Sequence, residues 1–220
     1  MSLHAAWTTL DVELNSLSKH LRDFSAQRPL LSASLHFSVL DECLLEGLLS
    51  RVWQAWCSFC RTCVIDSCIG TVNRKGVVID ALPDAASKEH VSGAAIRAAR
   101  MPKCPWQGQA NRSLRTEPTW GDVDILVRVL TRLHPVNEKQ LVAGLSSGHP
   151  SAKALQLKRN GAAHNHHQNL AEIQTLQSAY LVFPIGHPTH AMFWTEPNSG
   201  DFLVTNAIQD LKDAGFAATS

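Results

Sequence analysis

The sequence predicts a mostly α-helical protein with a long central helix and a small β-containing C-terminal extension. Apolar residues recur at helical spacing over most of the 220 residues, and β-forming side chains are most frequent after residue 178. The 45% hydrophobic content suffices for a packed core. A net charge of +1 excludes a global basic field directed at nucleic acid, so any electrostatic recognition has to be local.

Two helices are predicted in the first third of the chain. Residues 10–24 carry leucines at positions that form one apolar stripe, followed by Pro29, which interrupts the helical pattern. Residues 38–68 are apolar on more than one side, which is typical of a central helix packed against several neighbours. Gly70 is predicted to end this helix.

Four cysteines fall on the predicted central helix, at Cys57, Cys60, Cys63 and Cys68. Their spacing is similar to that of loops that bind zinc or iron–sulfur clusters. On a continuous helix, however, cysteines three apart drift round the axis, which suits packing better than tetrahedral chelation. We therefore expect buried, reduced cysteines and a reducing compartment. A zinc or redox site on this helix is the alternative.

Residues 72–118 are predicted to form an irregular insertion, with a brief helix over residues 94–100 and a long loop after it. Basic residues around an exposed aromatic side chain can follow a nucleic-acid backbone and stack a base. A solvated loop anchored by Trp106 is the alternative interpretation. With one lysine from a later helix, the candidate RNA contacts are Arg97, Arg100, Lys103, Trp106, Arg112, Arg115 and Lys158.

Regular helices return after the insertion, separated by proline, glycine and asparagine signals. We expect a helix over residues 122–133 ended by Pro135, a helix capped by Asn137 with Gln140 and reaching residue 145, a turn at 148–151, and helices over 151–158 and 162–178.

The tail changes character, because residues 179–183, 191–195 and 202–205 are rich in β-formers. A turn at 197–200 predicts a hairpin between the last two segments, and Asn206 is expected to cap a final helix that ends at Gly215. We therefore divide the chain into a helical domain, residues 1–178, and a small β/α extension, residues 179–220, packed on it.

The strongest chemical signal is Arg159, Asn160 and His164, which lie within six positions. Arginine offers a planar fork of donors to phosphate oxygens, and histidine exchanges protons near neutral pH. Asparagine can hydrogen-bond through either end of its amide. Positions five apart on one continuous helix diverge by about 140°. Gly161 is therefore expected to bend the chain, so that Arg159 and His164 converge near a helix start that favours phosphate.

This Arg-Asn-x-x-x-His pattern, between apolar helices, resembles the signature of the HEPN superfamily of helical domains, many of which are ribonucleases. The resemblance implies a helical bundle and a metal-independent endoribonuclease without a cofactor. In such an enzyme the ribose 2′-hydroxyl attacks phosphorus and leaves a 2′,3′-cyclic phosphate. By the same resemblance, His164 would transfer the proton, Arg159 would stabilise the charged phosphate, and Asn160 would position the backbone or His164.

The resemblance also implies a homodimer whose two motifs share one cleft, and a role as a toxin or phage-defence effector with an antitoxin or defence-system partner. Family members place a polar or acidic residue of an earlier helix against the motif, for which Glu46 is the candidate, with Glu42 and Asp41 as alternatives. One HEPN subgroup has a modifiable tyrosine two residues after the motif histidine. This chain has His166 there, a candidate supporting residue.

Other functions stay open at this point. A non-catalytic HEPN module that binds RNA, a nucleotide or a partner protein could use the same residues. His166 and His167, with His187 and His190, could bind zinc or nickel, although a polar helix face is the plainer interpretation. The sequence shows neither a signal peptide nor an apolar run long enough to span a bilayer, so we expect a cytoplasmic protein without membrane contact.

Overall fold

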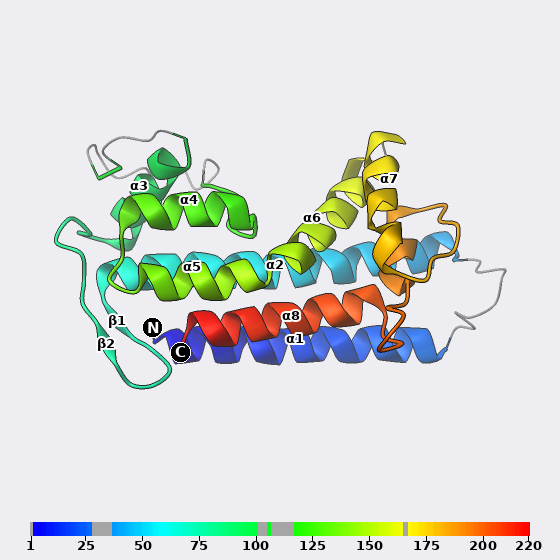
Figure 1. The fold of residues 1–220 in the computed structure, drawn as a ribbon, viewed down its shortest axis with the longest axis horizontal. Coiled ribbons are helices and arrows are strands. Elements are labelled where there is room, and N and C mark those ends of the chain that lie inside the picture. The colour runs from blue at the N-terminus through cyan, green and yellow to red at the C-terminus, as the bar shows by residue number, and fades with distance from the viewer. Residues whose placement is uncertain (1, 28–36, 101–104, 107–116, 165–166) are drawn as a thin grey trace. The chain divides into compact units, whose positions relative to one another are not determined.

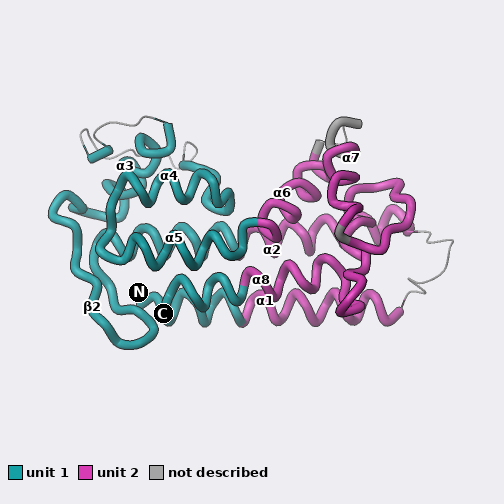
Figure 2. Tube along the Cα trace, in the orientation of Figure 1, with its two compact units in different colours: residues 1–11, 56–149, 212–220 teal, residues 12–55, 150–211 magenta. Residues whose placement is uncertain are grey.

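The structure is a computed structural model that describes residues 2–27, 37–100, 105–106, 117–164 and 167–220. Most of these residues are helical, which confirms the prediction of a mostly α-helical protein (Figure 1). The chain forms two compact units (Figure 2). Unit 1 comprises Met1–Asp11, Trp56–His149 and Lys212–Ser220, and unit 2 comprises Val12–Ala55 and Pro150–Leu211.

The described elements follow one another as helices, interrupted once by a two-stranded antiparallel sheet. They are α1 (Leu3–Ala26), α2 (Val39–Ile69), β1 (Thr71–Val72), β2 (Val78–Ile79), α3 (Lys88–Arg100), α4 (Val123–Leu133), α5 (Glu138–Ser147), α6 (His149–His164), α7 (His167–Gln174), the 3-10 helices η2 (Thr175–Ala179) and η3 (Pro188–Phe193), and α8 (Leu203–Ala218). Within the described ranges, no helix is long and apolar enough to cross a membrane.

The long helix α2 matches its predicted bounds to within one residue at each end. In unit 2 it buries Leu45, Leu49 and Val52, and in unit 1 it buries Trp56, whose indole Nε1 donates a hydrogen bond to the carbonyl of Gly121 over 3.2 Å. Gly70 ends the helix with a φ of +91°, a left-handed conformation that glycine adopts without steric cost.

In unit 1 the two ends of the chain join the middle helices. The end of α8 packs on α5 so closely that a Cβ at Gly144 would overlap the backbone of Ala218. Gly215 of α8 likewise lies against Leu10 and Phe59. The sheet of β1 and β2 pairs Val72 with Val78, inside the segment that the sequence predicted to be irregular.

Two local predictions between α4 and α6 were wrong. Asn137 precedes α5 but makes no side-chain cap; its amide donates instead to the hydroxyl of Ser67 over 3.1 Å. Gln140 bonds to the carbonyl of Ala217. These tertiary partners replace the expected capping box. The expected turn at 148–151 is limited to Gly148, because α6 begins at His149 with Pro150 in its first turn, where proline needs no amide hydrogen.

The tail of the chain is less β-like than its composition indicated. Among its described residues, pairing is limited to isolated bridges that join Thr195 to Leu181 and to Phe202, and η3 occupies part of the expected hairpin. Residues 191–194 are all buried, so they lack the in–out alternation of a half-buried strand. Helix α8 starts at Leu203, which places Asn206 inside it.

Unit 2 has its own core, which fixes the segments around the motif. Ile173 of α7, Ala191 of η3, Trp194 and Leu203 are fully or almost fully buried together. Trp194 Nε1 donates to the carbonyl of Phe183 over 3.2 Å, so its one polar atom is satisfied inside the core. This core holds α6, α7 and η3 in contact.

Candidate functional site

The motif lies in the last turns of α6, and this helix runs without a break through Gly161 to His164. The expected bend at Gly161 is therefore wrong, and Arg159 and His164 start about 140° apart around the helix axis. Asn160 and His164, four positions apart, share one face of α6. The side chain of His164 lies outside the described part of the structure.

Gly161 has a packing role instead of a bending role. A Cβ at this position would lie 3.2 Å from Ile173 Cδ1 and 3.2 Å from Pro188 Cβ and Cγ. Both distances are shorter than ordinary van der Waals contact, so a larger residue here would require the side chains of Ile173 and Pro188 to shift by a few tenths of an ångström. Gly161 thus allows α6 to pack directly against Pro188 at the start of η3.

The two motif side chains that the structure describes are joined to each other. Arg159 Nη1 donates to Asn160 Oδ1 over 3.2 Å, and both side chains are half-buried. The neighbouring Lys158 is completely buried, and its Nζ donates to the carbonyl of Ala154 over 3.2 Å. Burial lowers the pKa of Lys158 to about 7. A buried ammonium group cannot contact a phosphate at the surface, so Lys158 is not expected to bind RNA.

The acidic candidates of α2 take two kinds of role: one caps the helix and two pair with histidines. Asp41 accepts from the backbone N–H and the hydroxyl of Ser38 over 2.9 and 2.8 Å, and the Ser38 hydroxyl accepts from the Asp41 N–H, which together cap the start of α2. Glu42 Oε1 lies 3.1 Å from His190 Nε2, and Glu46 Oε1 lies 3.2 Å from His187 Nε2. Glu42, Glu46, His187 and His190 are called the Glu–His cluster below.

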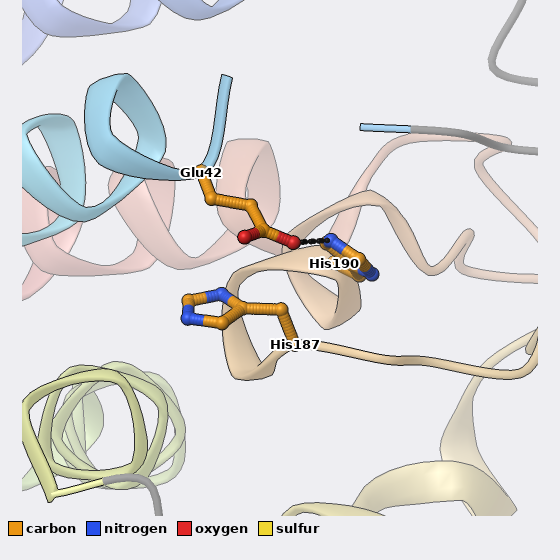
Figure 3. Close-up of side chains that lie close together, drawn as sticks. All are labelled: Glu42, His187 and His190. Carbon is orange, nitrogen blue, oxygen red and sulfur yellow. Dashed lines mark hydrogen bonds and ion pairs between the residues drawn. The ribbon is translucent and has the colours of Figure 1, made fainter. Parts of the chain in front are cut away.

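The two histidines of this cluster are held by further contacts. His187 Nδ1 lies 2.8 Å from Thr189 Oγ1 and accepts from the Thr189 N–H, and His190 Nδ1 accepts from the Gly186 N–H over 3.4 Å. The His187 and His190 side chains are 15% and 11% exposed, with ring centroids 5.8 Å apart (Figure 3).

The protonation of His190 reflects its surroundings. Burial lowers the pKa of His190, the hydrogen bond and charge of Glu42 oppose that shift, and His187 adds to it. The ring of Phe37 lies 4.4 Å from that of His190, centroid to centroid, and excludes water from one side. The neutral imidazole is therefore favoured at this position.

The Glu–His cluster and the motif helix are neighbours within unit 2. Pro188, which contacts Gly161 of α6, follows His187 directly in the chain. The sequence contains a signal for this pairing: Glu42 and Glu46 are four apart on a helix, and His187 and His190 are three apart. The signal was missed because the partners His190 and Glu42 are 148 positions apart.

The cysteines of α2 have the environment expected of core residues. Cys60, Cys63 and Cys68 are buried, and desolvation raises the pKa of each thiol, to about 12 for Cys68. Metals bind the thiolate, which such burial disfavours. Within the described residues, the group placed to hold a metal ion contains Glu42, His187 and His190 and no cysteine.

The candidate RNA contacts of the insertion belong to unit 1, where three of them are described. Arg97 Nε donates to the carbonyl of Pro105 over 2.7 Å, Arg100 is exposed at the end of α3, and half-buried Trp106 packs edge-on against His90. The remaining candidates Lys103, Arg112 and Arg115, together with His166, lie outside the described residues.

A second polar network lies in unit 1 and was not predicted from the sequence. The Glu117 carboxylate accepts two hydrogen bonds from Arg61, at 2.8 Å each, one from Ser92 and one from Trp120 Nε1. Burial raises the pKa of Glu117, but these donors outweigh it and lower the pKa to about 2. These hydrogen bonds join α2, α3 and the segment before α4.

Comparisons with known proteins give no relative from which to infer a function. No protein-family model matches the chain, and no curated protein or solved structure gives a significant match. Function is therefore inferred from the residues and their geometry.

Proposed function

We propose that this protein is a metal-independent endoribonuclease of the HEPN type. The observation that carries the proposal is the hydrogen bond between Arg159 and Asn160 at the end of α6, where His164 follows on the Asn160 face. A phosphate-binding guanidinium, an amide that orients it and a proton-transfer group thus share the last two turns of one helix.

The reaction would be transesterification within RNA. The ribose 2′-oxygen attacks the adjacent phosphorus while His164 removes the 2′-hydroxyl proton, and the bond from phosphorus to the 5′-oxygen breaks. The 5′-oxygen takes up a proton, which leaves a 2′,3′-cyclic phosphate and a 5′-hydroxyl. Arg159 would neutralise the charge that builds up on the phosphate oxygens, the kind of preorganised stabilisation that contributes most in such reactions.

The acidic support expected from an earlier helix is assigned to Glu46. In unit 2 this carboxylate pairs with His187, which precedes the proline packed on Gly161 of the motif helix. Glu46 would act on the motif through this segment, as a positioning residue. Because the assignment rests on packing and not on contact with substrate, its replacement should weaken cleavage without abolishing it.

The second proton-transfer group is proposed to come from a second copy of the chain. One motif supplies one histidine, whereas the reaction has a proton to remove and a proton to deliver. Two motifs that share a cleft would supply both. Light scattering of the active protein tests this assembly, since a monomer that cleaves RNA at full rate contradicts it.

Cleavage of RNA by purified protein in excess EDTA tests the proposed activity, with product ends identified by mass spectrometry. We expect cyclic phosphate and 5′-hydroxyl ends, and loss of cleavage in Arg159→Ala and His164→Ala. The matched control is His149→Ala, since His149 lies at the opposite end of α6 and pairs with Asp124 at the surface. Cleavage retained in His164→Ala would overturn the mechanism. RNA bound but left intact by the wild-type protein would identify a non-catalytic module instead.

A further inference from the structure

We propose that Glu42, His187 and His190 form a binding site for a divalent transition-metal ion of the zinc class, which ties η3 to α2. The ligand atoms of these three residues all lie within 4.8 Å of one another. The site is separate from the proposed RNA chemistry, which needs no metal.

The distances suit an ion between the side chains. With bonds of about 2.0–2.2 Å, two ligands of a tetrahedral zinc ion lie roughly 3.3 Å apart. His190 Nε2 and Glu42 Oε1 are 3.1 Å apart, so the ion can take the place of the hydrogen that they share, with little movement of either side chain. Figure 3 shows the Glu42 carboxylate and the two imidazole rings facing one another.

The geometry of His187 provides an outer partner of the kind that metal-binding histidines use. Its Nδ1 accepts from the Thr189 N–H, so the ring proton is on Nε2, which faces Glu46 Oε1 at 3.2 Å. With Nδ1 as the ligand atom, the metal ion would displace the contacts of Nδ1 with the N–H and the hydroxyl of Thr189. The Nε2–H would then donate to Glu46 and complete a carboxylate–histidine–metal arrangement. At His190, binding through Nε2 moves the ring proton to Nδ1 and releases only the long contact with Gly186.

The ligand types select the class of ion. Two imidazoles and one carboxylate suit zinc, cobalt or nickel, whereas calcium and magnesium prefer sites made wholly of oxygen. Both imidazoles are largely buried and come from one short segment, while the carboxylate comes from a long helix of the same unit. Three protein ligands leave a fourth position for water.

Titration of tag-free, EDTA-dialysed protein tests the site, with Zn²⁺ followed by calorimetry and Co²⁺ by its visible absorption. We expect one equivalent to bind, and at least tenfold weaker binding in His190→Gln, His187→Gln and Glu42→Gln. His134→Gln is the matched control, because His134 pairs with Glu138 on the exposed surface without a third ligand. We expect its affinity to equal that of the wild type.

A second measurement guards against a folding artefact in the buried His190 variant. Circular dichroism compares the fold of each variant with that of the wild type. Glu42→Gln is the most informative variant, because Glu42 is more exposed than His190 and its replacement disturbs the core less. Zn²⁺ should raise the Tm of the wild type and leave that of Glu42→Gln unchanged. Absence of stoichiometric binding, or equal affinity in folded variants, overturns the proposal. RNA cleavage in EDTA is measured separately, so failure of one proposal leaves the other standing.

Discussion

The guanidinium of Arg159 is tied to the amide oxygen of its neighbour Asn160 by a 3.2 Å hydrogen bond. Adjacent residues on a helix point about 100° apart, so the long arginine side chain has to reach round the helix to make this contact. The contact holds one nitrogen of the guanidinium, and among the described residues no other hydrogen bond of this group is seen.

Removing the amide should therefore weaken cleavage without changing the fold. In Asn160→Ala we expect the single-turnover cleavage rate to fall about tenfold, because a hydrogen bond to a charged group contributes roughly 1.5 kcal/mol. Arg159→Lys keeps the charge but loses the fork, and should lose more. Lys153→Ala, on an exposed part of the same helix, serves as the control. A rate in Asn160→Ala equal to that of the wild type would separate Asn160 from the site.

The motif also shows why the sequence could not predict the local geometry of its own residues. The central helix was predictable because its apolar residues are contiguous, and its end was predictable because Gly70 needs a positive φ. Gly161 carries the same local signal, yet it permits a close approach to Pro188 instead of a bend. Whether a glycine in a helix bends the chain or allows close packing depends on its tertiary neighbours. At Gly161 the neighbour is Pro188, 27 positions further along the chain, so no local sequence pattern includes it.

The Glu–His cluster illustrates the same limit for the candidate site. Glu46 and Glu42 were candidates as acids, and the histidine pair was noted, but nothing local links the helix near residue 42 to the segment near residue 190. Their pairing follows from the packing of unit 2, in which Phe193 stacks against Phe24 and Phe37. These ring contacts bring the segment near residue 190 to the start of α2, where the polar pairs form.

Gly144 and Gly47 offer a matched pair of glycine-to-alanine replacements. A Cβ at Gly144 would overlap the backbone of Ala218, whereas a Cβ at Gly47 of α2 meets nothing within 4 Å. We expect Gly144→Ala to lower the free energy of unfolding by about 2–4 kcal/mol, since backbone atoms cannot yield without moving the end of α8. Gly47→Ala should raise it by about 0.5–1 kcal/mol through helix propensity. Urea denaturation measures both, and similar effects in the two variants would contradict the packing.

Lys158 should make stability depend on pH in the alkaline range. Its pKa is about 7 in the folded protein and near 10.5 in the unfolded chain, so the unfolded state binds more protons between these values. Stability therefore rises with pH through this window, and the cost of the buried charge is largest below pH 7. Lys158→Met, similar in volume, should be more stable than the wild type at pH 6, by a margin that shrinks towards pH 10.

Denaturant unfolding at pH 6, 8 and 10 measures that margin for Lys158→Met and for Lys153→Met. The second variant removes an exposed lysine from the same helix, and its effect on stability should be small and independent of pH. A constant margin for Lys158→Met over the whole range would show that the ammonium reaches solvent in the folded protein.

Glu117 should produce the opposite dependence, at acid pH. Its pKa of about 2 in the folded protein is below the usual value of roughly 4.3 in an unfolded chain. The carboxylate therefore contributes stability that is complete above about pH 5 and is lost as the pH falls through the folded value near 2. Glu117→Gln should cost about 1–3 kcal/mol at pH 7, because Arg61, Ser92 and Trp120 all lose a charged acceptor.

The same variant should differ less from the wild type at pH 3. At that pH the Glu117 carboxylate is mostly protonated in the unfolded chain but still mostly ionised in the folded protein, so folding has to release a proton, and this offsets part of the stabilisation. Urea midpoints at pH 7 and pH 3 give the comparison, with Glu138→Gln as the control. Glu138 also pairs with a neighbour, His134, but that pair is at the surface, where ion pairs contribute little. A cost for Glu117→Gln as large at pH 3 as at pH 7 would show that shape, and not charge, holds α2, α3 and the segment before α4 together.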